Sequence, residues 1–424
     1  MGWAMALIPF TLLALGVPVF LILLVTVIVL LAFFLNIPFT VIPQAMFGSI
    51  DKFALLAVPF FIFAGEVMGQ GGISERLIRW VQSIFGGVRG SLALTTVGTC
   101  EFFGAISGSS PATLAAVGRI MYPALRANGY EEKFALGLVT SSGAIASIIP
   151  PSILMILYGA SAEQSVAALF IGGVFPGLLI GLLTALYIVF YARGRQLERV
   201  EPFRWGRFFR STRQGMWALG APVVILGSIY TGICTPTEAA GIAGVYGIVV
   251  TRYIYRDITW ARLWDIAGSS VFLTAQIMII VAASGVFSWL LTISGVPQAI
   301  VSAIAGLNVP PWLMLVAINV FLLVVGCLID PTSATLILTP LLVPIARASG
   351  VDLIHFGIIL TVNLSIGMFT PPFGLNLFLS QALFKAPMAR IARGLIPFIV
   401  IQVVALAIIT YVPWLSLSLT RFVH

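Results

Sequence analysis

Four short segments of the chain combine small residues, hydroxyl side chains and prolines in a pattern suited to binding ions. Two of them, residues 104–113 and 326–333, interrupt long apolar stretches, and the other two contain the double prolines Pro150-Pro151 and Pro371-Pro372. A helix that breaks at membrane depth leaves backbone carbonyls free, and these join hydroxyl oxygens as ligands for Na⁺. The helix that starts after a break presents N–H groups to an anion. The pattern therefore indicates binding of a cation together with an anionic substrate.

The alternative interpretation is that these motifs only pack or kink transmembrane helices. A constant spacing argues against it, because the same landmarks return further along the chain. The offset is 331 − 111 = 220 residues for the first pair and 344 − 123 = 221 for the second, and it is again 221 for the last two: Pro111 and Pro331, Pro123 and Pro344, Gly129 and Gly350, and Pro151 and Pro372. We infer two structural repeats.

The composition sets the class of protein. Of the 424 residues, 60% are hydrophobic and 8% are charged, whereas soluble proteins average about 25% charged residues. This excludes a soluble globular enzyme and indicates a polytopic membrane protein in a lipid bilayer. In a membrane protein, the net charge of +8 is expected to reflect the orientation of the chain in the membrane. We therefore expect no nucleic-acid partner. Neither a P-loop nor a His-Glu-x-x-His motif occurs, so we expect that the chain is not an enzyme.

We predict an all-α fold in which the elements repeat. Continuous spans are expected at residues 14–35, 53–68, 165–192, 215–233, 236–251, 266–291 and 394–416. Each repeat adds a re-entrant helical hairpin, at about 91–125 and 307–346, and a broken transmembrane helix, at about 134–160 and 356–384. The predicted units are a first repeat at 1–192, an Arg-rich loop with a linker helix at 193–235, and a second repeat at 236–424.

Arginine positions indicate how each repeat faces the membrane. The loop 193–213 carries seven arginines and is expected in the cytoplasm. The connection 292–311 has no charge and is expected outside, whereas its repeat partner 69–89 contains three arginines and is expected inside. Corresponding loops then lie on opposite sides, which is the pattern of an inverted-topology repeat. Counting the predicted spans outward from the Arg-rich loop puts the N-terminus in the cytoplasm and the C-terminus in the periplasm.

Four acidic residues lie in or near the apolar segments, and such residues are candidates for function. Asp330 precedes Pro331, so it suits both an N-cap and support of an ion site, and the sequence leaves both open. Glu238 follows Thr235-Pro236, which favours a helix start. For Glu66 and Glu101, hydrogen bonds that fix helices are the favoured interpretation.

The chain resembles the large membrane (M) subunit of tripartite ATP-independent periplasmic (TRAP) transporters, the DctM-like family, over essentially its whole length. The resemblance rests on residues 104–113, 149–152, 232–240 and 367–374. It implies an elevator-type transporter of the bacterial inner membrane that imports small organic anions with Na⁺. It also implies a small four-helix membrane subunit and a periplasmic substrate-binding protein as partners. A free-standing Na⁺/carboxylate symporter and the membrane component of an ATP-driven importer are the alternatives.

The resemblance also implies about two Na⁺ sites, one for each hairpin, and no organic cofactor. The Na⁺ ligands carried onto this sequence are Ser107, Ser110, Gly143 and Pro150 for the first site and Gly326, Gly367 and Thr370 for the second. The residues expected to bind substrate are Ser109, Thr332, Ser333, Asn363 and Asn376, with Asp330 in a supporting role. The chain departs from the commonest family pattern at Ala146 and Ser147, where Leu-Gly is frequent. The substrate stays open among C4-dicarboxylates, sialic acid, keto acids and sulfonates.

Overall fold

The computed structural model describes residues 2–35, 37–195, 197, 202–306 and 309–422, and all regular structure within them is helical. The prediction of an all-α chain is confirmed for these residues. Residues 307–308, where the second hairpin was predicted to start, lie outside them, as do 198–201 of the Arg-rich loop. The helices of the first half are α1 (Gly2–Ala14), α2 (Val19–Phe33), α3 (Val41–Ile50), the 3-10 helix η1 (Phe53–Leu56), α4 (Ala57–Gln70), α5 (Ile73–Phe85), α6 (Ser91–Ser107), α7 (Ser110–Ala127), α8 (Glu132–Ile145), α9 (Ile153–Ala162) and α10 (Val166–Ala192).

The second half begins with a long helix that follows the Arg-rich loop. Its elements are α11 (Trp205–Tyr230), α12 (Pro236–Ile248), the π-helix η2 (Val249–Ile254), α13 (Trp260–Ile293), α14 (Val296–Gly306), α15 (Pro311–Gly326), α16 (Pro331–Ala348), α17 (Leu353–Gly367), α18 (Leu375–Phe384), α19 (Met388–Tyr411), α20 (Trp414–Leu417) and the 3-10 helix η3 (Thr420–Phe422).

Many of these helices are apolar enough to lie in a bilayer. Within the described residues, five are also long enough to cross it: Phe53–Gln70, Val166–Ala192, Trp260–Ile293, Pro331–Ala348 and Met388–Tyr411. Other apolar helices have 10–17 residues, and α8 with α9 and α17 with α18 are short because each pair is one stretch interrupted by a double proline. This pattern is that of a multi-pass membrane protein.

The element bounds recur along the chain at the offset read from the sequence. Helix α16 begins 331 − 110 = 221 residues after α7 begins and ends 348 − 127 = 221 residues after α7 ends. Helices α17 and α18 follow α8 and α9 at the same offset within one residue, and both Pro150-Pro151 and Pro371-Pro372 are cis. The two hairpins and the two broken helices therefore occupy matching positions in the chain.

Two elements of the first half differ from the prediction. The span expected at 14–35 is the shorter α2, and a separate helix, α1, precedes it, because Gly16 takes a left-handed conformation (φ 74°) and Pro18 caps the start of α2. The second difference is a break at Asp51-Lys52, which separates α3 from η1 and α4. The corresponding segment of the second half is the uninterrupted α13, which has 34 residues.

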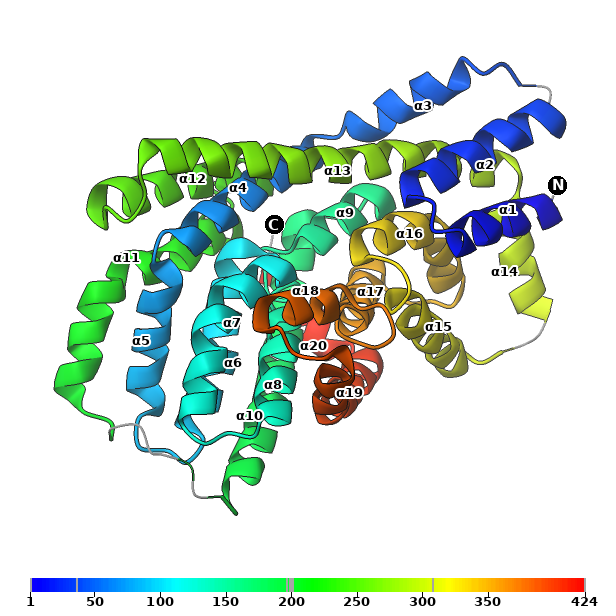
Figure 1. Ribbon diagram of the computed structural model, residues 1–424. Helices are drawn as coiled ribbons and strands as arrows, with labels where there is room; N and C mark the ends of the chain where they lie inside the picture. The colour runs from blue at the N-terminus through cyan, green and yellow to red at the C-terminus, as the bar shows by residue number, and fades with distance from the viewer. Residues whose placement is uncertain (1, 36, 196, 198–201, 307–308, 423–424) are drawn as a thin grey trace.

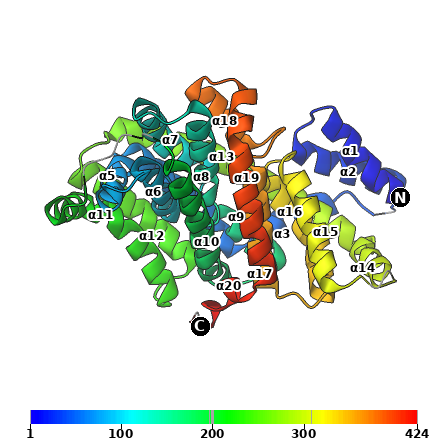
Figure 2. The same ribbon diagram turned by 90° about the horizontal axis from the view of Figure 1, so that it is seen from below.

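The helices form a wide assembly in which the two halves interleave (Figures 1 and 2). In both views α5, α11 and α12 lie on one side, α1, α14 and α15 lie on the other, and α8, α10 and α19 lie between them. Helix α13 crosses the assembly and packs against α2, α3, α4 and α16, while α8 packs on α19 and α9 packs on α16. Helices of one half therefore support the tips and breaks of the other.

The amphipathic segment predicted at 69–89 contains α5, which is fastened to the linker helix α11. The indole N–H of Trp80 donates to Thr212 Oγ1 at 3.0 Å, and Ser211 donates to Ser83 at 2.9 Å. Arg76 forms an ion pair with Asp257 at 2.6 Å. These contacts hold α5 beside α6, the first helix of the first hairpin.

Candidate functional site

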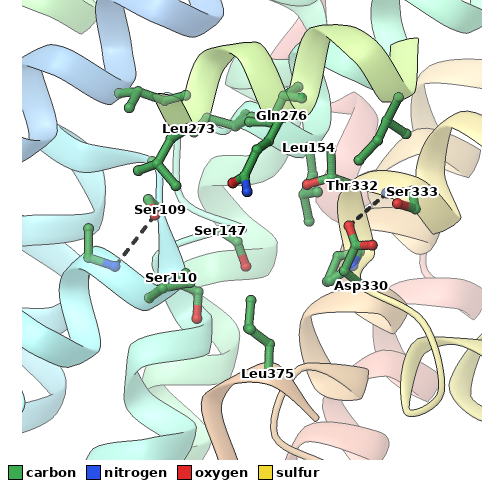
Figure 3. Close-up of a pocket in the computed structure, with 18 of the residues that line it drawn as sticks. Ser109, Ser110, Ser147, Leu154, Leu273, Gln276, Asp330, Thr332, Ser333 and Leu375 are labelled. Carbon is green, nitrogen blue, oxygen red and sulfur yellow. Dashed lines mark hydrogen bonds between the residues drawn. The ribbon is translucent and has the colours of Figure 1, made fainter. Parts of the chain in front are cut away.

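A cavity of about 520 Å³ lies where both hairpin tips meet both helix breaks (Figure 3). Residues 107–112 of the first tip and 330–333 of the second line it. Ser147 comes from the break between α8 and α9, and Met368 and Leu375 come from the break between α17 and α18. Segments far apart in the chain thus contribute hydroxyl groups, helix starts and backbone turns to one space.

The facing wall of the cavity is mostly apolar. Helix α13 provides the largest share of it, α4 adds Ile62, Gly65 and Glu66, and the start of α2 adds residues 18–20. Gln276 is the polar residue of α13 in this wall, and Figure 3 shows its amide extending into the cavity between the two tips. The α13 residues in the wall are Leu273, Gln276, Ile277, Ile279 and Ile280.

The first tip is held by a network of short-range hydrogen bonds. Gly108 takes a left-handed conformation (φ 58°) that reverses the chain after α6. Ser109 then caps α7, since its side chain accepts from Ala112 N. The Ser107 and Thr113 hydroxyls lie 3.1 Å apart, and Thr113 also donates to the Ser109 carbonyl at 2.9 Å. The turn is therefore fixed before any ligand arrives.

Close backbone approach fits the first tip against the first broken helix. A Cβ at Gly104 would lie 2.6 Å from Ala146 Cα, and a Cβ at Gly108 would clash with the Pro151 carbonyl. Ser147, in the break, shares a 2.7 Å hydrogen bond with Ser365 of α17. This last contact joins the two broken helices directly.

The second tip uses a different set of contacts. Asp330 is the N-cap of α16 and accepts from Ser333 N at 2.9 Å, so its predicted capping role is confirmed. A Cβ at Gly367 would lie 2.6 Å from both Cα and O of Gly326, which brings the end of α15 against the break after α17. Phe373 N donates to the Cys327 carbonyl at 3.2 Å and closes this contact.

One side chain links the second broken helix to the first hairpin. Asn376, in the first turn of α18, donates through Nδ2 to Ser110 Oγ at 2.7 Å, and it is fully buried. Thr140 of α8 and Ser380 of α18 lie one turn away and share a 2.7 Å hydrogen bond. Side-chain hydrogen bonds therefore join the second broken helix to both the first hairpin and the first broken helix.

The structure brings six of the residues named from the sequence to the cavity surface. They are Ser107, Ser109, Ser110, Asp330, Thr332 and Ser333. The other seven are not among its lining residues: Gly143, Pro150, Gly326, Gly367, Thr370, Asn363 and Asn376.

Two of these seven are chain neighbours of lining residues, since Gly367 precedes Met368 and Asn376 follows Leu375. Gly143 packs against Leu114 of the first hairpin, and Thr370 Oγ1 donates to the Ile366 carbonyl at 2.7 Å. Asn363 is further removed, because its Nδ2 donates to Asn319 Oδ1 at 2.8 Å within α15 and α17. It ties the second hairpin to the second broken helix.

Sequence reasoning did not identify Gln276 or assign a site role to Ser147. Gln276 lies in an otherwise apolar stretch of α13, and a polar residue in such a stretch was the available signal. Ser147 belongs to the predicted break and was also noted as a departure from a family pattern, but it was not named as a site residue. Of the other acids, Glu66 lines the cavity and Glu101 is packed against Gly181. Glu238 lies at the predicted helix start, where it closes a capping box with Thr235.

The oxygen atoms around the tips and the helix breaks are suitable ligands for an alkali cation. Within the part of the chain that the structure describes, no cluster of three or more His, Cys, Asp or Glu side chains could hold a transition metal. Hydroxyl and carbonyl oxygens are present instead, and these are ligands for hard cations. The buried hydroxyls of Ser142 in α8 and of Ser333 in the second tip have no hydrogen-bond partner among the described residues. A cation accepts lone pairs from such oxygens.

Comparison with known proteins identifies the family. Residues 6–415 match the family described as the tripartite ATP-independent periplasmic transporter, DctM component. The C4-dicarboxylate TRAP transporter large permease protein DctM of Pseudomonas aeruginosa is 41% identical over 377 residues, covering 89% of this chain and 88% of that protein. The ectoine TRAP transporter large permease protein TeaC of Halomonas elongata is 39% identical over 380 residues, covering 90% and 89%.

A third relative is longer than this chain. The isethionate TRAP transporter permease protein DctMQ of Oleidesulfovibrio alaskensis is 40% identical over 379 residues, which are 89% of this chain and 60% of that protein. Among solved structures, the YdaH transporter of Alcanivorax borkumensis has the same fold, with a TM-score of 0.64 at 15% identity over 89% of this chain and 87% of that chain. These relatives are transporter permeases, not enzymes. The chain belongs to the DctM component family of tripartite ATP-independent periplasmic transporters, as its sequence motifs suggested.

Proposed function

We propose that the chain imports a small organic anion together with Na⁺ across the bacterial inner membrane. The observation that carries this proposal is the cavity in which two hairpin tips and two helix breaks converge. Hydroxyl groups and helix N-termini suit a carboxylate or sulfonate, and free carbonyls near the breaks suit Na⁺.

The charges around the cavity support coupling to a cation. Glu66 and Asp330 line it, and no Lys, Arg or His is among the described residues that do so. An organic anion beside two carboxylates in a largely apolar wall is electrostatically unfavourable unless positive charge enters with it. Bound Na⁺ supplies that charge, so the anion binds well only after the cation.

The ligands of Na⁺ are proposed to come from both tips and both breaks. Ser107 and Ser110 serve the first site with the carbonyls of Gly143 and Pro150. Gly326, Gly367 and Thr370 serve the second. Asn363 is not proposed as a substrate contact, because its amide is engaged with Asn319 behind the tip. Asn376 positions Ser110 through the 2.7 Å hydrogen bond.

Inverted repeats and an elevator motion complete the proposal. The matching element bounds at an offset of 221 residues (331 − 110) support two repeats, and the arginine distribution supports their opposite orientation, with the N-terminus in the cytoplasm and the C-terminus in the periplasm. The hairpins and broken helices would move as one body, since Asn376, Ser147 and Ser365 join them by hydrogen bonds. Helices α2, α3, α4 and α13 would form the stationary wall.

The proposed partners are a small membrane subunit and a periplasmic binding protein. The relative whose name includes both M and Q is longer than this chain, which spans 60% of it. The family description, which names one component of a tripartite transporter, supports partner subunits. The exposed apolar surface of α15, including Trp312 and Val320, offers area for a membrane partner or for lipid.

The substrate is proposed to be a carboxylate or sulfonate of a few carbon atoms. The relatives are named for C4-dicarboxylates, isethionate and ectoine, which all carry a carboxylate or a sulfonate. The cavity volume of about 520 Å³ admits molecules of this size. Hydroxyls at both tips would bind the anionic group.

Transport by the reconstituted proteins tests the proposal. The chain is placed in liposomes with the small subunit and the binding protein encoded beside it, and uptake of labelled succinate, isethionate and ectoine is measured. We expect uptake of at least one of them with an inward Na⁺ gradient and none with K⁺ in its place. Uptake driven by ATP without Na⁺ would refute the proposal, and Na⁺-driven uptake without the binding protein would indicate a free-standing symporter.

A further inference from the structure

A second, smaller cavity of about 120 Å³ lies beside the central one and contains a lysine. Lys52 donates through Nζ to the Ala160 carbonyl at 2.6 Å, in the last turn of α9. The remaining polar groups of the cavity are serine hydroxyls. Its lining residues are Ser49, Lys52, Leu55, Leu157, Ala160, Ser161, Val281, Ser284, Gly285, Ser288 and Leu336.

The two cavities follow one another along the same helices. Helix α9 lines the central cavity at residues 153–154 and the smaller one at 157–161. Helix α13 does so at 273–280 and then at 281–288. Because one helical turn covers about 3.6 residues, the lysine cavity lies one to two turns from the central one, between the same walls.

The position of Lys52 results from the break in the first half. Helix α3 ends at Ile50, and Lys52 is the residue before η1. In the second half the corresponding residue is Leu273, since 52 + 221 = 273, and it lies inside the continuous α13. The break therefore turns a charged side chain towards α9 at a position where the other half has an apolar one.

The ammonium group of Lys52 can donate more hydrogen bonds than it makes in this structure. It has three donors, and Ala160 O accepts one of them. Lys52 forms no ion pair with any residue that the structure describes, although Asp51 is its neighbour in sequence. The cavity holds about four water molecules by volume, which is room for one carboxylate or sulfonate group.

We propose that Lys52 and the serines around it form an anion-binding subsite on the path to the central cavity. The subsite takes the carboxylate or sulfonate of the same substrate, so the inference depends on the proposed function. It supplies a fixed positive charge that the lining of the central cavity lacks, and it attracts the anion before the anion reaches the two tips and the bound Na⁺. When α9 lies against η1, as here, the Ala160 carbonyl accepts a hydrogen bond from the Lys52 ammonium group, which leaves two of its N–H donors for the anion.

Kinetics of variants in the reconstituted system test this role. Lys52→Gln is compared with Lys52→Arg, and Lys385→Gln is the matched control because Lys385 is exposed at the end of α18. Uptake of succinate and isethionate is measured at saturating Na⁺. We expect Lys52→Gln to raise the half-saturation concentration of the transported anion about tenfold with the maximal rate within twofold. Lys52→Arg and Lys385→Gln should resemble the wild type.

Different failures separate the two proposals. If the wild type takes up none of succinate, isethionate and ectoine with a Na⁺ gradient, the proposed function fails and the subsite fails with it. If the wild type transports and Lys52→Gln changes only the maximal rate, Lys52 merely caps α9 and the subsite alone is refuted.

A labelling experiment covers the case in which Lys52→Gln does not insert. Ser161→Cys is made in a chain whose Cys100, Cys234 and Cys327 are serine, with Lys52 retained. Its reaction with 2-sulfonatoethyl methanethiosulfonate, itself an anion, is followed with and without the transported anion. We expect the anion to slow the labelling at least threefold, and an unchanged rate would refute the subsite.

Discussion

The two hairpin tips occupy matching positions in the chain but are held in different ways. The first tip lies on α6, which is buried along nearly its whole length, and its hydroxyls bond to one another and to Asn376. The second tip follows α15, which exposes Trp312, Val320 and other apolar side chains and packs chiefly on α17. A shared offset therefore fixes where the helices break, whereas local side chains fix how firmly each tip is held.

The difference is clearest in the backbone contact behind each tip. Gly104 meets Ala146 in the first half, and Gly326 meets Gly367 in the second. Ala146 and Gly367 correspond, since 367 − 146 = 221. The second contact is glycine on glycine, so the second tip depends on close backbone approach, while the first depends more on its hydrogen bonds.

Gly367→Ala should have the largest effect, because its Cβ would lie 2.6 Å from Gly326 Cα. Overpacking of this kind costs about 1–3 kcal/mol, and we expect uptake to fall at least about tenfold. The matched control is Gly326→Ala, whose Cβ would lie 3.3 Å from Gly367 Cα, and it should retain most activity. Ala146→Gly should also be tolerated. Equal loss in Gly326→Ala and Gly367→Ala would contradict the described geometry.

Asn376→Leu tests the hydrogen bond on which the first tip depends. The change removes the donor to Ser110 and leaves a buried hydroxyl without it, a loss worth about 1–3 kcal/mol. We expect the Na⁺ concentration for half-maximal uptake to rise about fivefold, with the protein still inserted. Ser380→Ala, which removes the neighbouring bond to Thr140, should change it less than twofold. A larger effect of Ser380→Ala would mean that general packing of α18 matters more than Ser110.

Ser107→Ala and Thr370→Ala compare the two proposed Na⁺ sites directly. Each removes one hydroxyl ligand, and a net contribution of about 0.5–1.5 kcal/mol per hydrogen bond sets the scale. We expect a two- to fivefold weaker Na⁺ dependence of uptake in each case. Thr113 keeps its bond to the Ser109 carbonyl in the first variant, so the tip remains folded. Normal Na⁺ activation in both variants would show that the ligand assignment is wrong.

Asp330 should give the smallest effect and separates capping from charge. Asparagine is as good an N-cap as aspartate, so Asp330→Asn should keep the thermal stability while raising the Na⁺ requirement about twofold through loss of charge. Asp330→Ala should lower the stability by about 1 kcal/mol as well. If Asp330→Asn has a normal Na⁺ requirement, the residue acts as a cap alone.

Much of this arrangement was predictable from sequence because it depends on residue types that are close together in the chain. Proline, glycine and hydroxyl residues fix the ends of α6, α7, α15 and α16, and the predicted hairpins agree with these helices within a few residues. The cap at Asp330 and the capping box at Glu238 also follow from residue order.

Other features depend on contacts that a single sequence does not reveal. The break at Asp51-Lys52 has no glycine or proline at its centre, and it depends on packing of η1 against α9. The hydrogen bond from Asn376 to Ser110 joins residues 376 − 110 = 266 positions apart. Gln276 faces the cavity because α13 crosses it, which hydropathy alone does not show.

The length of α13 has a consequence for how the molecule sits in its lipid surroundings. Trp264 and Trp289 lie near its two ends, and tryptophans favour the two headgroup layers. The 25 residues between them (289 − 264) span about 38 Å at 1.5 Å per residue, whereas the hydrocarbon layer is about 30 Å thick. The helix is therefore long enough to span the bilayer and to accommodate some tilt, and its packing against α2, α3, α4 and α16 sets that tilt. The anchoring tryptophans thus fix the depth of the central cavity wall in the bilayer, because the same helix provides part of that wall.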